Sequence, residues 1–153
     1  TNRPLLTAAV WIGCVNCHNK GKRVGRWIPA ALAECVTTEH LHPDTRALTS
    51  KVPDLACHTF WCFETANLPR NEEMSPRSAA AWAMNLHRTP EELRAAYTAW
   101  VHTYDIDDPE QATPELFKTV YLGRYATTDL TDELRNTCSS AEADEDSMYL
   151  FLD

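Results

Sequence analysis

Two closely spaced pairs of cysteines are the residues best suited to chemistry in this sequence. Cys14 and Cys17 are separated by two residues, and Cys57 and Cys62 by four. Thiolates at such spacings are typical ligands of tetrahedral zinc. Each pair lies at the end of a predicted strand, so the four thiolates would form one closed site if those strands are neighbours in a sheet. Further candidate ligands are His18, Cys35, His40, His42 and His58.

The cysteines could also be buried in the core, attach haem or take part in catalysis. Free cysteine is commonly a small buried hydrophobic side chain. Cys14-x-x-Cys17-His18 also has the spacing of a c-type haem attachment motif, but haem attachment requires export and an open pocket. A nucleophilic Cys57 or Cys62 would need a histidine and an orienting third group, and no oxyanion hole is recognisable. We therefore expect neither catalysis nor a cofactor, with structural zinc as the alternative.

The acidic side chains are concentrated towards one end of the chain. The net charge is −8, yet residues 101–153 carry thirteen acidic and three basic side chains, whereas residues 1–50 carry three acidic and six basic ones. A local field of this sign repels nucleic acid and attracts basic grooves. The alternative is a solvated acidic face that serves only solubility.

The first part of the chain has the pattern of a small β module. Strands are predicted over residues 8–15, 23–28 and 55–63, which are apolar or rich in β-forming side chains. A turn is predicted at residues 19–22 and a short helix at 30–36.

The pattern becomes helical after residue 72. Ser75 before a proline is an N-cap signal for a helix that ends near residue 86. Thr89 and Glu92 form a capping box for the next helix, whose apolar side chains share one face. A third helix is expected to open at Thr113 and to end at Gly123.

The last residues combine a short helix with acidic and apolar segments. A fourth helix is predicted over residues 128–136, a loose acidic segment over 139–146 and a short strand over 148–152. These elements predict an α+β fold: a small antiparallel β module (1–70), a helical module (71–104) and an acidic helical module (105–153). No segment reaches the length of about 20 apolar residues that a membrane span needs, so we expect a cytoplasmic protein with reduced thiols.

Three segments together resemble the ArdA family of antirestriction proteins. The first is an apolar strand and a turn followed by Gly-x-Trp-Ile, carried by Asn19, Gly21, Gly25, Trp27 and Ile28. The second contains His58, Phe60 and Phe63, and the third contains Phe117, Tyr121, Gly123 and Tyr125, preceded by Ala99-Trp100-Val101. The order and spacing of these segments carry the resemblance over residues 8 to 137.

The resemblance implies a non-catalytic homodimer in a bacterial host that imitates DNA and occupies the DNA-binding groove of a type I restriction-modification enzyme. It contacts no nucleic acid or membrane itself, and Tyr121 and Tyr125 are candidate dimer contacts. At one charge per about 1.7 Å of duplex, the net charge of two chains corresponds to about eight base pairs. We expect the mimicry to be concentrated in Asp105, Asp107, Asp108, Glu110, Glu115, Asp129, Asp132, Glu133, Glu142, Asp144, Glu145 and Asp146.

Carboxylates at i, i+3 and i+4 of one helix lie about 5–6 Å apart, and this is the relation expected for Asp129, Asp132 and Glu133.

Other functions remain open from the sequence alone. One is a zinc-stabilised nucleic-acid-binding module that uses the basic hairpin of Lys20, Lys22, Arg23 and Arg26 with Trp27. Another is inhibition of a different DNA-handling defence enzyme, and a third is a dimeric interaction protein with exposed aromatic side chains.

Overall fold

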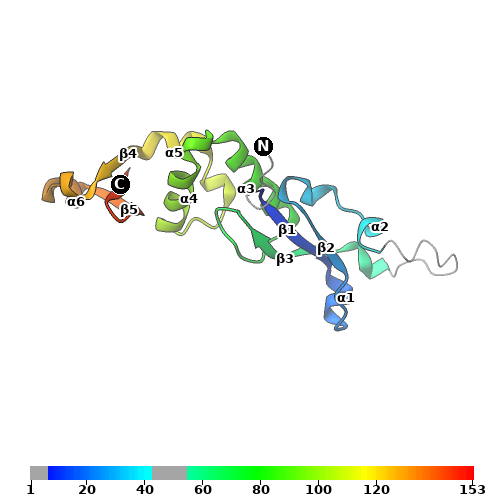
Figure 1. The fold of residues 1–153 in the computed structure, drawn as a ribbon. Helices are drawn as coiled ribbons and strands as arrows, with labels where there is room; N and C mark the ends of the chain where they lie inside the picture. The colour runs from blue at the N-terminus through cyan, green and yellow to red at the C-terminus, as the bar shows by residue number, and fades with distance from the viewer. Residues whose placement is uncertain (1–6, 43–54) are drawn as a thin grey trace. The chain divides into compact units, whose positions relative to one another are not determined.

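The computed structural model describes residues 7–42 and 55–153, and the chain separates into two compact units, Thr1–Ala83 and Met84–Asp153. Each unit contains one three-stranded antiparallel sheet together with helices (Figure 1), so the predicted α+β class is confirmed. The predicted modules 1–70 and 105–153 each fall inside one unit, and residues 71–104 are divided between the two.

The sheet of the first unit has the strand order β2-β1-β3. Its central strand is β1 (Ala9–Cys14), flanked by β2 (Gly25–Pro29) and β3 (Phe60–Ala66). β1 pairs with β2 and with β3 in antiparallel register, and a register shift in the second pairing lies between Trp11 and Ile12. Val10 and Ile12 are completely buried, as expected for the apolar centre of a sheet.

Short helical segments connect these strands. They are α1 (Val15–Asn19), η2 (Ala30–Cys35), α2 (Thr38–Leu41) and η4 (Leu55–His58). The strand predicted for residues 55–63 begins only at Phe60, because residues 55–58 form a 3₁₀ turn. Residues 43–54, between α2 and η4, lie outside the described part of the chain.

Helix α3 (Pro76–Arg88) confirms the helix predicted from the serine and proline at its start. The backbone N–H of Ser78 donates to the Ser75 hydroxyl at 3.1 Å, the N-cap bond that this signal predicts. Ala79 and Trp82 are buried, so this helix supplies core.

The following helix starts differently from its prediction. A 3₁₀ turn, η5 (Glu91–Leu93), precedes α4 (Arg94–Thr103), and the capping box of Thr89 and Glu92 is wrong. The Thr89 hydroxyl instead donates to the Asn85 carbonyl at 2.7 Å, so this side chain bonds back to the last turns of α3. The predicted apolar face of α4 is confirmed, since Ala96, Tyr97, Trp100 and Val101 are all buried.

The 3₁₀ turn η6 (Pro109–Gln111) and α5 (Pro114–Val120) complete the helical part of the core. The completely buried Phe117 packs edge-on against Tyr97, with ring centroids 5.6 Å apart. The prediction that this helix continues to Gly123 is wrong, because the chain turns into β4 (Tyr121–Ala126). Gly123 has a positive φ of 124° and follows a register shift within that strand.

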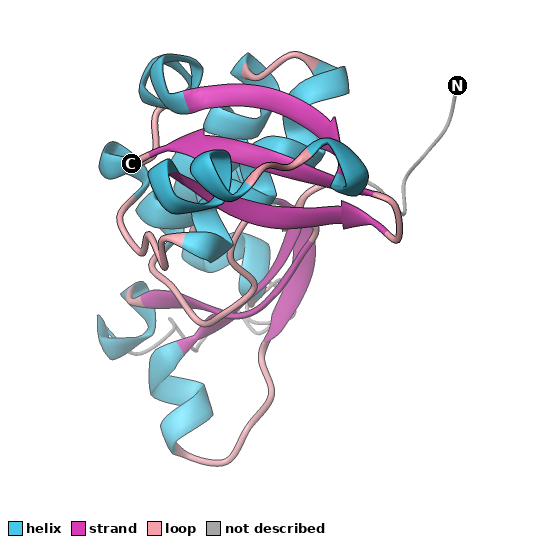
Figure 2. Cartoon of the chain, turned by 90° about the vertical axis from the view of Figure 1, so that its left-hand side faces the viewer, coloured by secondary structure: helices cyan, strands magenta, loops and turns pink. Residues whose placement is uncertain are grey.

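The second sheet has the order β4-β6-β5, and its three strands are drawn in magenta with those of the first sheet in Figure 2. After β4 come η7 (Thr127–Asp129) and α6 (Asp132–Thr137), then the hairpin of β5 (Cys138–Asp144) and β6 (Ser147–Leu152). Helix α4 packs against β5 and β6. The predicted final strand is confirmed, and no helix in the described ranges is long and apolar enough to cross a membrane.

Candidate functional site

The twelve carboxylates predicted to imitate phosphates all lie on the second unit and are all exposed. We call this set the acidic surface: Asp105, Asp107, Asp108, Glu110, Glu115, Asp129, Asp132, Glu133, Glu142, Asp144, Glu145 and Asp146. The second unit as a whole carries fifteen acidic and five basic side chains, a net −10, whereas the first carries seven and nine, a net +2. The charge of the protein is therefore divided along the boundary between its two units.

The first group of carboxylates lies around the turns that lead into α5. Asp108 caps η6, since its carboxylate accepts from the Glu110 N–H at 2.9 Å. Glu115 lies in the first turn of α5, where the positive end of the helix favours a negative charge. The Arg88 guanidinium pairs with Glu115 and lowers the pKa of its carboxyl group, so this charge is partly neutralised.

The second group lies at the start of α6. Asp132 and Glu133 occupy its first turn, directly after the N-cap Thr131, whose hydroxyl accepts from the Leu134 N–H at 3.2 Å. Asp129 belongs to the separate turn η7, so the expected i, i+3, i+4 relation on one helix is wrong. Two of the three carboxylates are held by the same helical turn, and the third is placed by the turn before it.

The third group lies on the β5–β6 hairpin. Residues 139–146 were expected to be loose, and that expectation is wrong, because residues up to 144 pair with β6. Glu142 and Asp144 are exposed while Ala141 and Ala143 between them are partly buried. Exposed and partly buried residues thus alternate as in a half-buried strand, although the pairing with β6 shifts register between Glu142 and Asp144.

Asp144 is the most firmly held member of the acidic surface. Its Oδ1 accepts from the Asp146 backbone N–H and from the Ser147 hydroxyl, both at 2.8 Å. Its Oδ2 pairs with the Arg124 guanidinium. The bond from the Asp146 N–H, together with these two partners, lowers the pKa of the Asp144 carboxyl group. Asp144 therefore stabilises the hairpin, and pairing with Arg124 makes its charge less available to a partner.

The model of the family described as "Antirestriction protein (ArdA)" matches residues 10–153. The chain belongs to the ArdA family. Comparisons with curated proteins and with solved structures found no match. ArdA proteins are antirestriction proteins, inhibitors that interact with restriction enzymes and not enzymes themselves. The resemblance inferred from three segments is thus confirmed over nearly the whole chain.

The glycines of the first ArdA segment lie where the sheet leaves no room for a side chain. Gly13 and Gly25 are paired neighbours in β1 and β2. A Cβ on Gly25 would overlap the Ile12 carbonyl oxygen and approach the Gly13 Cα to 2.8 Å. Gly21 has a φ of 77°, in the left-handed region that favours glycine. These ArdA-like positions therefore serve the fold of the first unit.

The two tyrosines predicted as dimer contacts have different surroundings. Tyr121 stacks on Phe117 at a centroid distance of 5.0 Å and an interplanar angle of 18°, and it also contacts Phe151. Tyr125 is 38% exposed on β4. Tyr121 thus belongs mainly to the core of the second unit, and Tyr125 is the more accessible of the two.

The basic hairpin of the first unit is partly engaged within the chain. The Arg23 guanidinium pairs with Glu64 at 2.8 Å and lies 4.2 Å from the centroid of the Trp11 ring. Lys20 and Lys22 are exposed, and Trp27 is 48% exposed. Arg23 therefore stabilises the packing of the sheet as well as adding positive charge.

Three of the four cysteines of the proposed zinc set come together, and the fourth does not. Cys14, Cys17 and Cys57 form one buried cluster, with the partly buried Val24 against it. Cys62 is buried in β3, where its backbone bridges to Met74. Burial raises the pKa of Cys62 to about 12, and burial together with the neighbouring Cys14 thiol raises that of Cys17 to about 12. A catalytic thiol needs the opposite shift.

His42, and not Cys62, is the fourth potential metal-binding side chain beside the three clustered cysteines. Its ring lies beside the cysteine cluster, although 25 residues separate it from Cys17 in the sequence. The sequence indicates His42 only as a residue type that can bind metal, because the polar residues around it show no helix or strand periodicity that would fix its position.

Proposed function

We propose that this ArdA protein inhibits a type I restriction-modification enzyme by placing the acidic surface of its second unit in the groove that binds DNA. The observation that carries the proposal is the exposure of all twelve carboxylates on one unit whose net charge is −10. A groove that binds DNA presents arginines and lysines to phosphate, and these bind carboxylates with charge-assisted hydrogen bonds.

The amount of charge limits the length of DNA that can be replaced. Duplex DNA carries one charge per about 1.7 Å, so a net charge of −10 corresponds to about 17 Å, or about five base pairs. Two copies of the second unit would replace about ten base pairs. A homodimer therefore supplies a decoy of the size of a short recognition site, and we include dimerisation in the proposal.

Order in the acidic surface supports imitation over simple solubility. Asp108 caps η6, Asp132 and Glu133 lie in a capped first turn, and Asp144 accepts two hydrogen bonds. Carboxylates fixed by the backbone lose less conformational entropy on binding than carboxylates on a loose segment. Glu115 and Asp144 are paired with arginines of the same chain, so we expect these two to contribute less to the proposed contacts.

The test is capture of a type I methyltransferase core by the full chain, with and without competing duplex DNA. Asp132→Lys with Glu133→Lys should weaken capture by at least about tenfold, because like charges then face each other across the interface. Glu91→Lys with Glu92→Lys is the matched control, since these exposed acids occupy the first turn of η5 outside the acidic surface. The proposal is contradicted if competing duplex DNA does not reduce capture, or if both variants lose capture to the same extent.

A further inference from the structure

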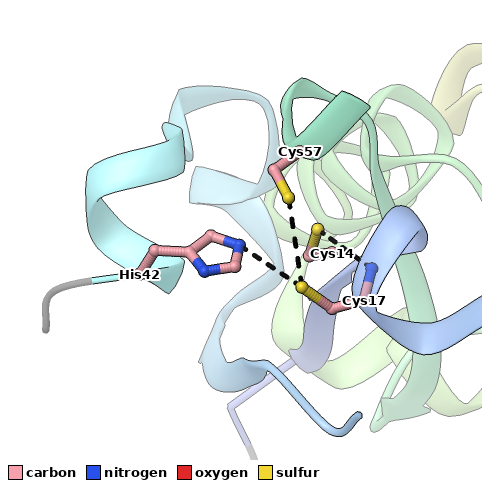
Figure 3. A group of neighbouring side chains, drawn as sticks. All are labelled: Cys14, Cys17, His42 and Cys57. Atoms are coloured by element: carbon pink, nitrogen blue, oxygen red, sulfur yellow. Dashed lines mark hydrogen bonds between the residues drawn. The ribbon is translucent and has the colours of Figure 1, made fainter. Parts of the chain in front are cut away.

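Four potential metal-binding side chains from separate segments of the first unit converge on one point (Figure 3). The Sγ atoms of Cys14, Cys17 and Cys57 and a ring nitrogen of His42 all lie within 4.8 Å of one another. We propose that these four residues bind one zinc ion in a closed structural site with three thiolates and one imidazole. Neither the family match nor the acidic surface implies such a site.

The distances fit a tetrahedral metal. Zinc binds sulfur at about 2.3 Å and imidazole nitrogen at about 2.0–2.1 Å, so tetrahedral geometry places two sulfurs about 3.8 Å apart and sulfur and nitrogen about 3.6 Å apart. The Cys17 and Cys57 Sγ atoms lie 4.0 Å apart, and the Cys17 Sγ lies 3.9 Å from the His42 Nε2. These two separations are within about 0.3 Å of the tetrahedral values, and none of the separations among the four atoms exceeds 4.8 Å.

The fold provides each ligand from a defined backbone position. Cys14 ends β1, Cys17 lies in the single turn of α1, Cys57 lies in η4, and His42 follows the last residue of α2. Antiparallel pairing of β1 with β3 brings the chain before β3, which includes Cys57, beside the end of β1. The site therefore links the ends of elements that the sheet alone does not hold.

Hydrogen-bond donors already point at two of the sulfurs. The Cys17 backbone N–H lies 3.5 Å from the Cys14 Sγ, and the Asn16 side-chain amide lies 3.3 Å from the Cys57 Sγ. Donors of this kind stabilise thiolates around a bound metal and orient them. Exposure is 1% for Cys14, 8% for Cys17 and 5% for Cys57, and His42 is partly buried, so the three thiols lie in the buried environment typical of a structural site.

Neighbouring histidines and cysteines are used elsewhere, so the set of four is specific. The His40 Nδ1 accepts from the Thr37 backbone N–H at 2.9 Å, and the His58 Nδ1 lies 3.1 Å from the Thr38 hydroxyl. His18 stacks on Phe63. Cys35 is exposed, and Cys62 lies in β3.

The alternative uses of these cysteines fit the geometry less well. A disulfide needs sulfurs about 2.05 Å apart, whereas the Cys17 and Cys57 Sγ atoms lie 4.0 Å apart. Packing as small hydrophobic side chains explains their burial but not the ring nitrogen directed at them. A unit of this size also has a small core, and metal binding adds free energy that supports its folding.

The test is metal content and cobalt spectroscopy on the full chain, purified under reducing conditions. We expect about one zinc per chain, and in the Co²⁺-loaded protein the intense visible bands of a tetrahedral thiolate site. Cys17→Ser and His42→Ala should each weaken metal binding by at least about tenfold, measured by competition with a chromophoric chelator. His42→Cys should keep the metal in a site of four thiolates, and Cys35→Ser is the control that should leave binding unchanged.

A second measurement covers variants that fail to fold. A strong chelator added to the wild-type chain should lower its Tm, and restored zinc should raise it again. Metal-free protein with an unchanged Tm and no Co²⁺ bands overturns the proposal, as does full retention of metal in Cys17→Ser. Neither result would affect the acidic surface, which lies on the other unit.

Discussion

At the scale of single residues, the carboxylates of the acidic surface differ in what holds them. Asp144 is fixed by a backbone N–H, a hydroxyl and a guanidinium, whereas its neighbour Glu145 is exposed at the tip of the same hairpin. An exposed carboxylate can thus serve the fold or a partner, and pairing with its own chain makes it less available to a partner.

Asp144 gives the hairpin a stability that depends on pH. Its pKa in the folded chain lies below the unfolded value of about 3.9, first because of the Asp146 N–H and then the Ser147 hydroxyl. The stabilisation is present above pH 4 or so and is lost as the pH falls through the lowered folded pKa. Asp144→Asn should therefore lower the Tm most near neutral pH and progressively less towards pH 2.

The measurement is thermal unfolding of wild type and Asp144→Asn from pH 2 to 7. Glu145→Gln removes one negative charge from the same turn and is the matched control, for which we expect little change in Tm. A deficit of Asp144→Asn that stays constant down to pH 2 would show that the carboxylate charge is not what holds the turn.

At the scale of elements, the sequence predicted the strands and helices that have strong periodicity. The apolar face of α4 and the buried centre of β1 were correct, because burial follows the same period as the side chains. The end of α5 was wrong, because Tyr121 continues the helical period of Phe117 and yet pairs with Phe151 of β6. Pairing between distant segments outweighs local periodicity there.

The β5 strand shows a signal that was present but outweighed by composition. Ala141 and Ala143 alternate with Glu142 and Asp144, which is the pattern of a half-buried strand. The many acids in residues 139–146 suggested a loose segment instead. Of the candidate zinc ligands, Cys14, Cys17 and Cys57 followed from spacing and strand pairing, whereas the choice of His42 over Cys62 required the three-dimensional structure.

The pairing of β1 and β2 depends on close backbone contact at one position. Gly25→Ala places a Cβ against the Ile12 carbonyl oxygen and the Gly13 Cα, and backbone atoms cannot turn aside as a side chain can. We expect the substitution to destabilise the chain by about 2 kcal/mol or more, measured by urea unfolding. The physical cause is a forced separation of the two strands.

Gly21→Ala is the comparison that separates steric overlap from backbone strain. No atom lies within 4 Å of its added Cβ, and only the φ of 77° opposes the substitution. Its cost should be about 1 kcal/mol, typical of one residue held in the left-handed region. If Gly21→Ala proves the more damaging of the two, close packing at Gly25 is not what limits this sheet.

At the scale of the whole molecule, the difference in net charge between the two units predicts which unit contacts the partner. The first unit has a net charge of +2 and the second a net charge of −10, so attraction to a basic groove arises from the second. Inhibition that depended only on total charge would gain from any added acid. Inhibition through the acidic surface would depend on where the charge is.

Lys20→Glu with Lys22→Glu separates these two cases, because it changes the net charge from −8 to −12 on the first unit alone. We expect capture of the methyltransferase core to stay within about twofold of wild type at 0.15 M salt. At this ionic strength the Debye length is about 8 Å, so salt screens charges that do not contact the groove. If capture instead strengthens as much as Asp132→Lys with Glu133→Lys weakens it, total charge is what binds. If the double lysine variant loses capture, the basic hairpin belongs to the interface. Binding of duplex DNA by the wild-type chain at low salt would then identify the hairpin as a contact to nucleic acid.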